Sequence, residues 1–310
     1  MSIMRSVLLA GAESVWLREK AMRYPFVRRS VSRFMPGESV DEALDACRRQ
    51  QEQRGTGTIL THLGENLSSL SEAEAVTRHY LELIDRVAAM GLDVQVSVKL
   101  TQLGLDLGLD ACHQNLWQIV GRAESHGNTV WIDMESTKYV DPTIELFRRA
   151  RARSPRVGLC LQAYLYRTQA DLEALLPLGP AIRLVKGAYR EPPDLAFPKK
   201  ADVDENYFQL AARMLQPDVP QGTFLGIGTH DEHLVERLRS VMASRPAGPA
   251  SHEFEMLYGI QRPLQARLVA ERAPLRILIS YGEFWFPWYM RRLAERPANV
   301  LFVAKSMFAG

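Results

Sequence analysis

The chain has 310 residues, of which 38 are Lys or Arg, 36 are Asp or Glu and 46% are apolar, and its formal net charge is +2. This composition excludes a disordered or collagen-like chain, and the balanced charge argues against nucleic-acid binding. The three cysteines, Cys47, Cys112 and Cys160, form neither a C-x-x-C pair nor a zinc pattern, which favours a reducing compartment and predicts a cytoplasmic protein.

The N-terminal segment is basic. Residues 1–36 hold seven basic and two acidic residues, a local net charge of +5. A helical extension with a solvated charged face is the favoured interpretation. The alternative is a basic surface for anionic lipid, which would put the protein peripherally at the inner face of the cell membrane. The apolar run at 7–12 is short, so neither a cleaved signal nor a membrane span is expected.

Short β-rich segments recur after residue 57, and a helical pattern follows each. Eight such units in series predict an α/β fold, a (β/α)8 barrel over residues 56–310, with residues 1–55 as a helical extension outside it. An open doubly wound sheet is the competitor, but the two G-x-G pairs, at 55–57 and 226–228, lack the third glycine of a dinucleotide loop. The predicted strands are Thr58–Gly64, Val94–Leu100, Thr129–Glu135, Val157–Ala163, Ala181–Ala188, Thr223–His230, Ser251–Leu257 and Leu275–Tyr281.

Capping signals predict where several helices begin. They are Ser71 with Glu74 as a capping box, Asp141 with Pro142 at the first helical position, and Asp231 before a helix that runs to Ala243. A last helix is expected from Glu283 onward.

Polar side chains gather where the predicted strands end, which is where barrel enzymes place their chemistry. In the strand at 94–99 one face is all valine and the other all polar, so Lys99 should face the barrel interior. Asp133 and Glu135 share a face of the next strand, and Arg183 lies on the fifth. Two interpretations stay open: a site for a charged, polar ligand, or a self-satisfied network of ion pairs such as Lys99–Asp133 or Asp133–Arg183.

Other arrangements are less specific. His230 and His233 have the spacing of a metal pair, but His233 would lie inside the following helix, so no metal site is expected. Lys99 or Lys186 could form a Schiff base, which makes a lyase or aldolase on the same barrel the alternative enzyme class. A non-catalytic, lipid-associating scaffold built on the basic N-terminus is a third hypothesis.

The adjacent pair Arg291-Arg292 stands on the predicted last helix. Two guanidinium groups suit a carboxylate if the helix lies over the site. The alternative is a solvated pair in which Arg291 contacts Glu295 one helical turn later.

At this point several separate motifs, in matching order from about Thr58 to the C-terminus, resemble bacterial monofunctional proline dehydrogenases. They are Arg183-Leu184-Val185-Lys186-Gly187-Ala188-Tyr189, Gly228-Thr229-His230, Glu253-Phe254-Glu255-Met256-Leu257-Tyr258-Gly259, and Arg291-Arg292-Leu293 with Asn299 after it.

The resemblance implies a distorted (β/α)8 barrel that carries FAD and oxidises L-proline to Δ1-pyrroline-5-carboxylate. Hydride would pass from proline Cδ to flavin N5 and electrons onward to a membrane quinone. This is the first step of proline catabolism, which links the chain functionally to pyrroline-5-carboxylate dehydrogenase.

The resemblance also implies roles for individual residues. Lys99, Arg291 and Arg292 would bind the substrate carboxylate, and Asp133 would sit beside the reacting ring. Arg183 and Gln162 would contact the isoalloxazine near N5 and O4. The other residues implied to line the flavin are Met134, Lys186, Gly187, Ala188, Thr229 and His230.

Two positions depart from the family pattern. Where the family usually presents tyrosines, this chain has Leu278 and Trp288, with Tyr281 and Tyr289 nearby. The substitutions predict a more apolar pocket wall, which bears on how strictly L-proline is preferred over hydroxyproline.

Overall fold

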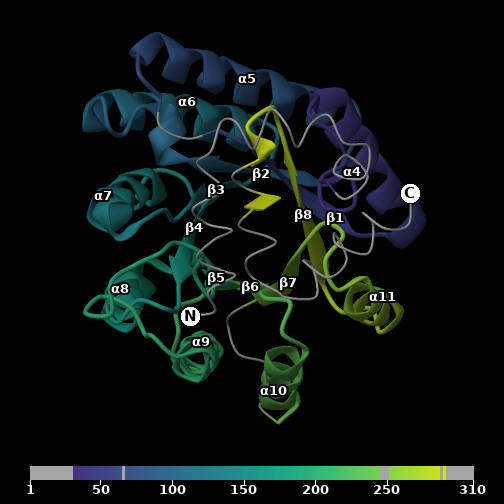
Figure 1. The fold of residues 1–310 in the computed structure, drawn as a ribbon, viewed down its shortest axis with the longest axis vertical. Helices are drawn as coiled ribbons and strands as arrows, with labels where there is room; N and C mark the ends of the chain where they lie inside the picture. The colour runs from purple at the N-terminus through teal and green to yellow at the C-terminus, as the bar shows by residue number, and fades with distance from the viewer. Residues whose placement is uncertain (1–30, 65–66, 245–250, 287–288, 291–310) are drawn as a thin grey trace.

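The computed structural model describes residues 31–64, 67–244, 251–286 and 289–290. Within these ranges eight parallel strands close into a barrel in chain order, so the predicted (β/α)8 fold is confirmed (Figure 1). The strands are β1 Gly57–His62, β2 Val94–Lys99, β3 Val130–Asp133, β4 Val157–Gln162, β5 Ala181–Val185, β6 Phe224–Gly228, β7 Ser251–Leu257 and β8 Leu275–Tyr281.

Helices surround the barrel on its outside (Figure 1). They are α4 Val40–Arg54, α5 Leu70–Ala89, α6 Leu109–Ser125, α7 Val140–Arg151, α8 Thr168–Leu175, α9 Lys200–Met214, α10 Glu232–Ala243 and α11 Arg262–Ala270. Helix α4 packs on β1 and β8. The division into an extension at 1–55 and a barrel at 56–310 stays a prediction, because residues 1–30 lie outside the described ranges.

The start of α5 corrects the predicted capping box. Ser69, not Ser71, caps the helix, and its Oγ accepts a hydrogen bond from the backbone N of Glu72 at 3.3 Å. Glu72 Oε2 in turn accepts from the backbone N of Ser69 at 3.2 Å. The sequence holds two overlapping S-x-x-E matches, and the earlier one is used, which leaves Ser71 inside the helix.

Two predicted caps also work differently. Helix α7 continues directly from a 3-10 turn at Thr137–Tyr139 and begins at Val140, so Asp141 lies within its first turn and accepts from Arg167 at 2.6 Å. Asp231 does precede α10, but its side chain makes no capping hydrogen bond. The carboxylate of Asp231 binds Lys186 instead, at 2.7 Å.

Strand alternation sorts the side chains of the barrel. The three valines of β2 are buried in the main core between strands and helices, whereas Gln95, Ser97 and Lys99 point inward. A small apolar cluster formed by Ile59, Trp131, Ala181, Phe224 and Leu278 fills part of the barrel interior.

Gly158 of β4 makes room for the largest side chain in this cluster. A Cβ on Gly158 would lie 2.4 Å from the ring of Trp131, so glycine is needed for the indole to fit.

A separate apolar cluster joins both ends of the described chain at the carboxyl-end face of the barrel. We call it the mouth cluster; its buried members are Val31, Phe34, Met35, Leu63, Ile260, Trp285, Phe286 and Tyr289. Trp285 Nε1 donates a hydrogen bond to Glu38 Oε1 at 2.9 Å, which adds a polar tie between the two segments. The chain before α4 is therefore packed on the helical segment that follows β8.

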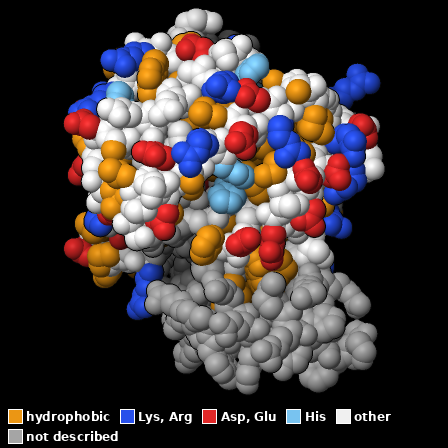
Figure 2. Space-filling view, turned by 90° about the horizontal axis from the view of Figure 1, so that it is seen from above, with side chains coloured by type: hydrophobic (Ala, Val, Ile, Leu, Met, Phe, Trp, Pro, Cys, Tyr) orange, Lys and Arg blue, Asp and Glu red, His pale blue; other side chains and the backbone are white. Residues whose placement is uncertain are grey.

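The face of the molecule in Figure 2 carries acidic and basic side chains interspersed over its described part, with no broad region of one sign. Among the helices that the structure describes, none combines the length and apolarity that a membrane crossing requires.

Candidate active site

A cavity of about 390 Å³ opens where the barrel strands end. Ten of the twelve predicted site residues line it, although they come from five different strands and the segments after them. The ten are Lys99, Asp133, Met134, Gln162, Arg183, Lys186, Gly187, Ala188, Thr229 and His230. Arg291 and Arg292 lie outside the described residues. The structure thus brings the predicted residues together, and their roles stay predictions.

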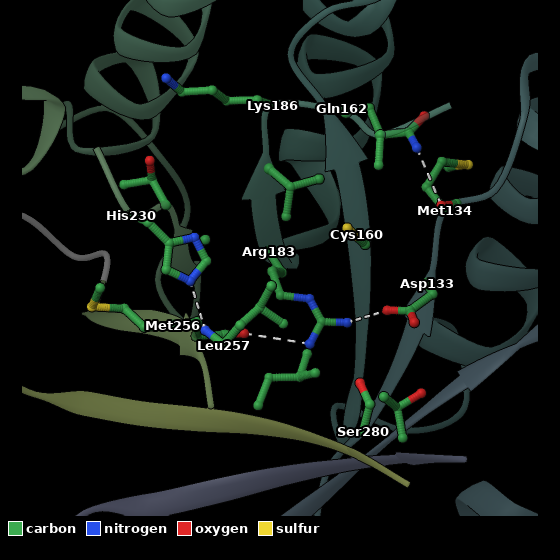
Figure 3. Close-up of a pocket in the computed structure, with 18 of the residues that line it drawn as sticks. Asp133, Met134, Cys160, Gln162, Arg183, Lys186, His230, Met256, Leu257 and Ser280 are labelled. Atoms are coloured by element: carbon green, nitrogen blue, oxygen red, sulfur yellow. Dashed lines mark hydrogen bonds and ion pairs between the residues drawn. The ribbon is translucent and has the colours of Figure 1, made fainter. Parts of the chain in front are cut away.

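A charged cluster forms one wall of the cavity (Figure 3). Lys99 Nζ lies 2.8 Å from Asp133 Oδ2, and Arg183 Nη2 donates to Asp133 Oδ1. Ser97 Oγ donates to Asp133 at 2.8 Å and accepts from Arg183 at 2.7 Å. Both ion pairs considered from the sequence are therefore present, and the three residues that form them line the open cavity.

The charges in this cluster fix the protonation state of Asp133. Burial opposes ionisation of its carboxyl group, but the positive charges of Lys99 and Arg183 outweigh burial and lower the pKa to about 2. Burial also opposes the charge on Arg183, and the carboxylates of Asp133 and Glu255 raise its pKa above the usual value. At neutral pH Asp133 is an anion, so it can accept hydrogen bonds but cannot donate a proton.

The low pKa of Asp133 predicts a pH dependence of stability. A carboxyl group whose pKa is lower folded than unfolded stabilises the fold above about pH 4, and this contribution, about 2 kcal/mol, is lost as the pH falls toward 2. Urea unfolding of the wild type and Asp133→Asn should differ most above pH 4, and the difference should shrink below it. A difference that stays constant down to pH 2 would contradict the assignment.

Glu255 reaches Arg183 from the other side. Its Oε2 lies 3.4 Å from Arg183 Nη1, and within the described part of the chain its buried Oε1 has no hydrogen-bond partner. Burial raises the pKa of Glu255 to about 7, against the opposing effect of Arg183. One guanidinium is therefore shared by two carboxyl groups with very different surroundings.

Lys186 belongs to a second cluster. Figure 3 shows it extending away from Arg183, and its Nζ binds Asp204 of α9 at 2.5 Å and Asp231 at 2.7 Å. Lys200 binds the same two carboxylates, with Asp231 at 3.3 Å. A Schiff-base lysine must be neutral to attack a carbonyl. The amines of Lys99 and Lys186 are both engaged by carboxylates, an arrangement that disfavours the lyase alternative.

Several polar atoms in the cavity wall have hydrogen-bonding capacity left over. Gln162 Nε2 donates to the backbone O of Met134 at 3.2 Å, but among the described residues nothing donates to its buried Oε1. The hydroxyls of Thr61 and Ser280 are likewise buried without a described partner. His230 Nε2 accepts from the backbone N of Leu257 at 2.8 Å, which leaves Nδ1 as the protonated nitrogen of the neutral ring.

Gly187 follows β5 with a φ of 110°, and a Cβ there would lie 2.1 Å from the Tyr164 ring. Gly187→Ala should therefore lower the free energy of unfolding by about 1–3 kcal/mol and distort the cavity wall. Gly121→Ala is a matched control, because Gly121 lies within α6 with open space around it and should be neutral or stabilising. Thermal unfolding checks both variants, and equal melting temperatures would contradict the steric argument.

Some sequence expectations were wrong or incomplete. Glu135 does not share the cavity with Asp133, because β3 ends at Asp133 and the Glu135 carboxylate turns to Thr101, accepting from its Oγ1 at 2.7 Å. Leu278 does line the cavity, while Tyr281 is buried behind it and bonds His79 Nε2 at 2.7 Å. Tyr281 therefore does not replace a cavity tyrosine. Trp288 lies outside the described residues.

Ser97 and Lys200 were not predicted as site residues. The strand alternation around Lys99 already placed Ser97 on the same inward face, so its contact with Asp133 was accessible from sequence. Lys200 reaches the cavity from the start of α9 after a long irregular segment, and no periodic pattern pointed to it.

Comparison with known proteins assigns the family. The family model described as proline dehydrogenase matches residues 43–305. The chain belongs to the proline dehydrogenase family. It is 35% identical over 307 residues to proline dehydrogenase 2 of Bacillus subtilis subsp. natto, covering 99% of both chains. It is 37% identical over 287 residues to the proline dehydrogenase of Deinococcus radiodurans, covering 90% of each.

Among solved structures, the chain resembles proline utilization A from Bdellovibrio bacteriovorus inactivated by N-propargylglycine, with a TM-score of 0.76 and 24% identity. The match covers 86% of this chain but only 32% of that one, so this chain spans about a third of its length. At this identity the likeness supports the barrel fold of the family and nothing more specific.

Proposed function

We propose that this proline dehydrogenase family member uses FAD to oxidise L-proline to Δ1-pyrroline-5-carboxylate, as the first step of proline catabolism. The observation that carries the proposal is the cavity in which Lys99, Asp133 and Arg183 meet beside the Gln162 side-chain oxygen, which has no partner among the described residues. A barrel of this kind places such a cavity at the site of chemistry.

The cavity wall fits a flavin ring system. The ring offers an imide N–H as a donor and carbonyl oxygens as acceptors. Among the described residues, the buried Gln162 Oε1 lacks a donor, and the Thr61 and Ser280 hydroxyls lack an acceptor, so the two sets are complementary. Arg183 and Gln162 would hold the ring, and the chemistry supplied by bound FAD is acceptance of a hydride from proline Cδ at flavin N5. The remaining residues proposed to hold the cofactor are Met134, Lys186, Gly187, Ala188, Thr229 and His230.

The charged cluster accounts for substrate binding. Lys99, together with Arg291 and Arg292, would hold the proline carboxylate by charge-assisted hydrogen bonds and fix the ring in one orientation. Asp133, ionised at neutral pH, would accept a hydrogen bond from the substrate nitrogen and hold the reacting ring in place. The Arg183 cation would stabilise negative charge that arrives beside it, which favours reduction in the cavity.

Spectroscopy of the purified protein tests the proposal. We expect a yellow protein whose visible flavin absorbance bleaches when L-proline is added without oxygen. A colourless protein that stays inactive after reconstitution with FAD would overturn it. Trapping by borohydride with a carbonyl substrate would instead support the Schiff-base alternative through Lys99 or Lys186.

The wall at Leu278 bears on the choice of substrate. An apolar wall discriminates weakly against a ring substituent, whereas a tyrosine hydroxyl adds a polar contact that can select for or against one. We expect hydroxyproline to be oxidised with a kcat/KM within about tenfold of that for L-proline. Steady-state assays of both substrates side by side check this, and complete rejection of hydroxyproline would contradict it.

We further propose a membrane quinone as electron acceptor, with contact to anionic lipid through the basic segment 1–36. The product would be consumed by pyrroline-5-carboxylate dehydrogenase. Co-sedimentation with anionic vesicles, with and without residues 1–36, tests the lipid contact. Equal sedimentation of the two chains would remove the segment from that role.

A further inference from the structure

Two carboxyl groups share the Arg183 guanidinium, and their surroundings are unequal. Asp133 receives hydrogen bonds from Ser97 and Arg183 and pairs with Lys99, so its negative charge is compensated on both oxygens. Glu255 has one 3.4 Å contact to Arg183, and its other oxygen has no partner among the described residues. With 3% of its surface exposed, Glu255 has little solvent to make up the difference.

The barrel leaves a dedicated space for this carboxyl group. A Cβ on Gly226 of β6 would lie 2.2 Å from Glu255 Oε1, so glycine at this position of the neighbouring strand leaves room for the oxygen. A larger residue at 226 would displace the carboxyl group from Arg183. The contact is therefore set by packing from two strands and not by one flexible side chain.

Charged groups continue from Glu255 toward the other end of the barrel. Glu253 shares its face of β7 and pairs with Arg276 of β8, with Nε and Oε1 3.0 Å apart. Arg276 also pairs with Asp93 at 2.8 Å, and the Asp93 side chain is 60% exposed. The titratable and charged groups that interact electrostatically with Glu255 are Arg183 from β5, Glu253 from β7, Arg276 from β8 and Tyr207 from α9, while β6 contributes glycine.

We propose that Glu255 is the proton-exchanging carboxyl group of the site, which takes up a proton when negative charge arrives beside Arg183 and so makes the reduction potential of the bound cofactor depend on pH. This inference rests on the proposed function. Amine oxidation moves two electrons and one proton, as a hydride, from the substrate carbon to the acceptor, which gains one negative charge. The proton that Glu255 takes up comes from solvent.

The direction of the effect follows from the charge on Glu255. When Glu255 is protonated, the Arg183 cation is less compensated, and the potential is higher. When Glu255 is ionised, it opposes electron arrival, and the potential is lower. Because the pKa of Glu255 is raised by burial to about 7, this change should occur near neutral pH. Asp133 stays ionised over this pH range, so its effect on the potential does not change with pH.

The first experiment needs no cofactor chemistry. Infrared difference spectra of the full chain, titrated through neutral pH, should show a buried protonated carboxyl band that is absent in Glu255→Gln. Glu135→Gln is the matched control, since Glu135 is equally buried but bound to Thr101 outside the cavity, and it should keep the band. A wild type without a titrating buried carboxyl, or a Glu255→Gln protein that retains it, would overturn the proposal whether or not flavin binds.

The second experiment measures the flavin midpoint potential against pH in the holoenzyme. Wild type and Glu255→Gln should agree at acidic pH, and the variant should lie higher at alkaline pH, with the two curves separating near pH 7. Glu253→Gln should move the separation to lower pH, because the negative charge of Glu253 raises the pKa of Glu255. A difference between the curves that is independent of pH would overturn the proposal, even though a reducible flavin would leave the proposed function intact.

Discussion

Arg183→Met should lower the free energy of unfolding by about 3 kcal/mol or more at neutral pH. Arg183 is 2% exposed and is the described cation that contacts both Asp133 and Glu255. Its removal leaves buried negative charge that the remaining contacts of Asp133 compensate only in part. Urea unfolding measures the change, and the same variant should be inactive toward L-proline, because the guanidinium proposed to hold the cofactor ring is gone.

A double variant separates lost charge compensation from lost packing. Arg183→Met with Glu255→Gln removes the uncompensated carboxylate along with the cation, so part of the lost stability should return. Arg213→Met is the surface control, since Arg213 pairs with Glu173 and Asp218 in a solvated position and should change stability by less than about 1 kcal/mol. Equal losses in the single and double Arg183 variants would show that packing, not charge, dominates.

Lys99→Met should raise KM for L-proline by about 10- to 100-fold, which corresponds to one lost hydrogen bond between charged groups. Asp133 keeps Ser97 and Arg183 as partners, so the cluster should hold its shape. The expected kinetic signature is a KM effect larger than the kcat effect. Steady-state kinetics with L-proline provide the measurement.

Lys138→Met is the control for this prediction. Lys138 pairs with Asp106 outside the cavity at 2.8 Å, so its removal should leave KM within about twofold of wild type. An unchanged KM in Lys99→Met would remove Lys99 from the carboxylate site and would leave the carboxylate to Arg291 and Arg292.

The barrel could be predicted from the sequence because its signal is local and repeated. Each strand is short, apolar on the outward face and closed by glycine, proline or aspartate, so eight weak patterns support one another. The alternation of β2 placed Lys99 inside the barrel for the same reason. Errors arose where a local rule had two solutions, as in the overlapping capping boxes that begin at Ser69 and Ser71.

The details of the site depend on where strands stop and on contacts between distant segments. Glu135 was misplaced because β3 ends two residues before it, and strand alternation no longer applies there. The contact of Lys186 with Asp204 joins a strand end to a helix across an irregular segment, which no pattern in one segment encodes. The unequal environments of Asp133 and Glu255 likewise require the closed barrel, since their strands are far apart in the sequence.

The mouth cluster makes completion of the cavity depend on the two ends of the described chain. Leu63 and Leu257 line the cavity and also pack in or against this cluster, with Val31, Phe34 and Met35 on one side and Trp285 on the other. A ribosome would release every strand of the barrel before the segment that follows β8 could dock on residues 31–38. The barrel can therefore close before the mouth cluster has formed. A chain that begins at residue 39 should still form the barrel, but Leu63 and Leu257 should be exposed to water.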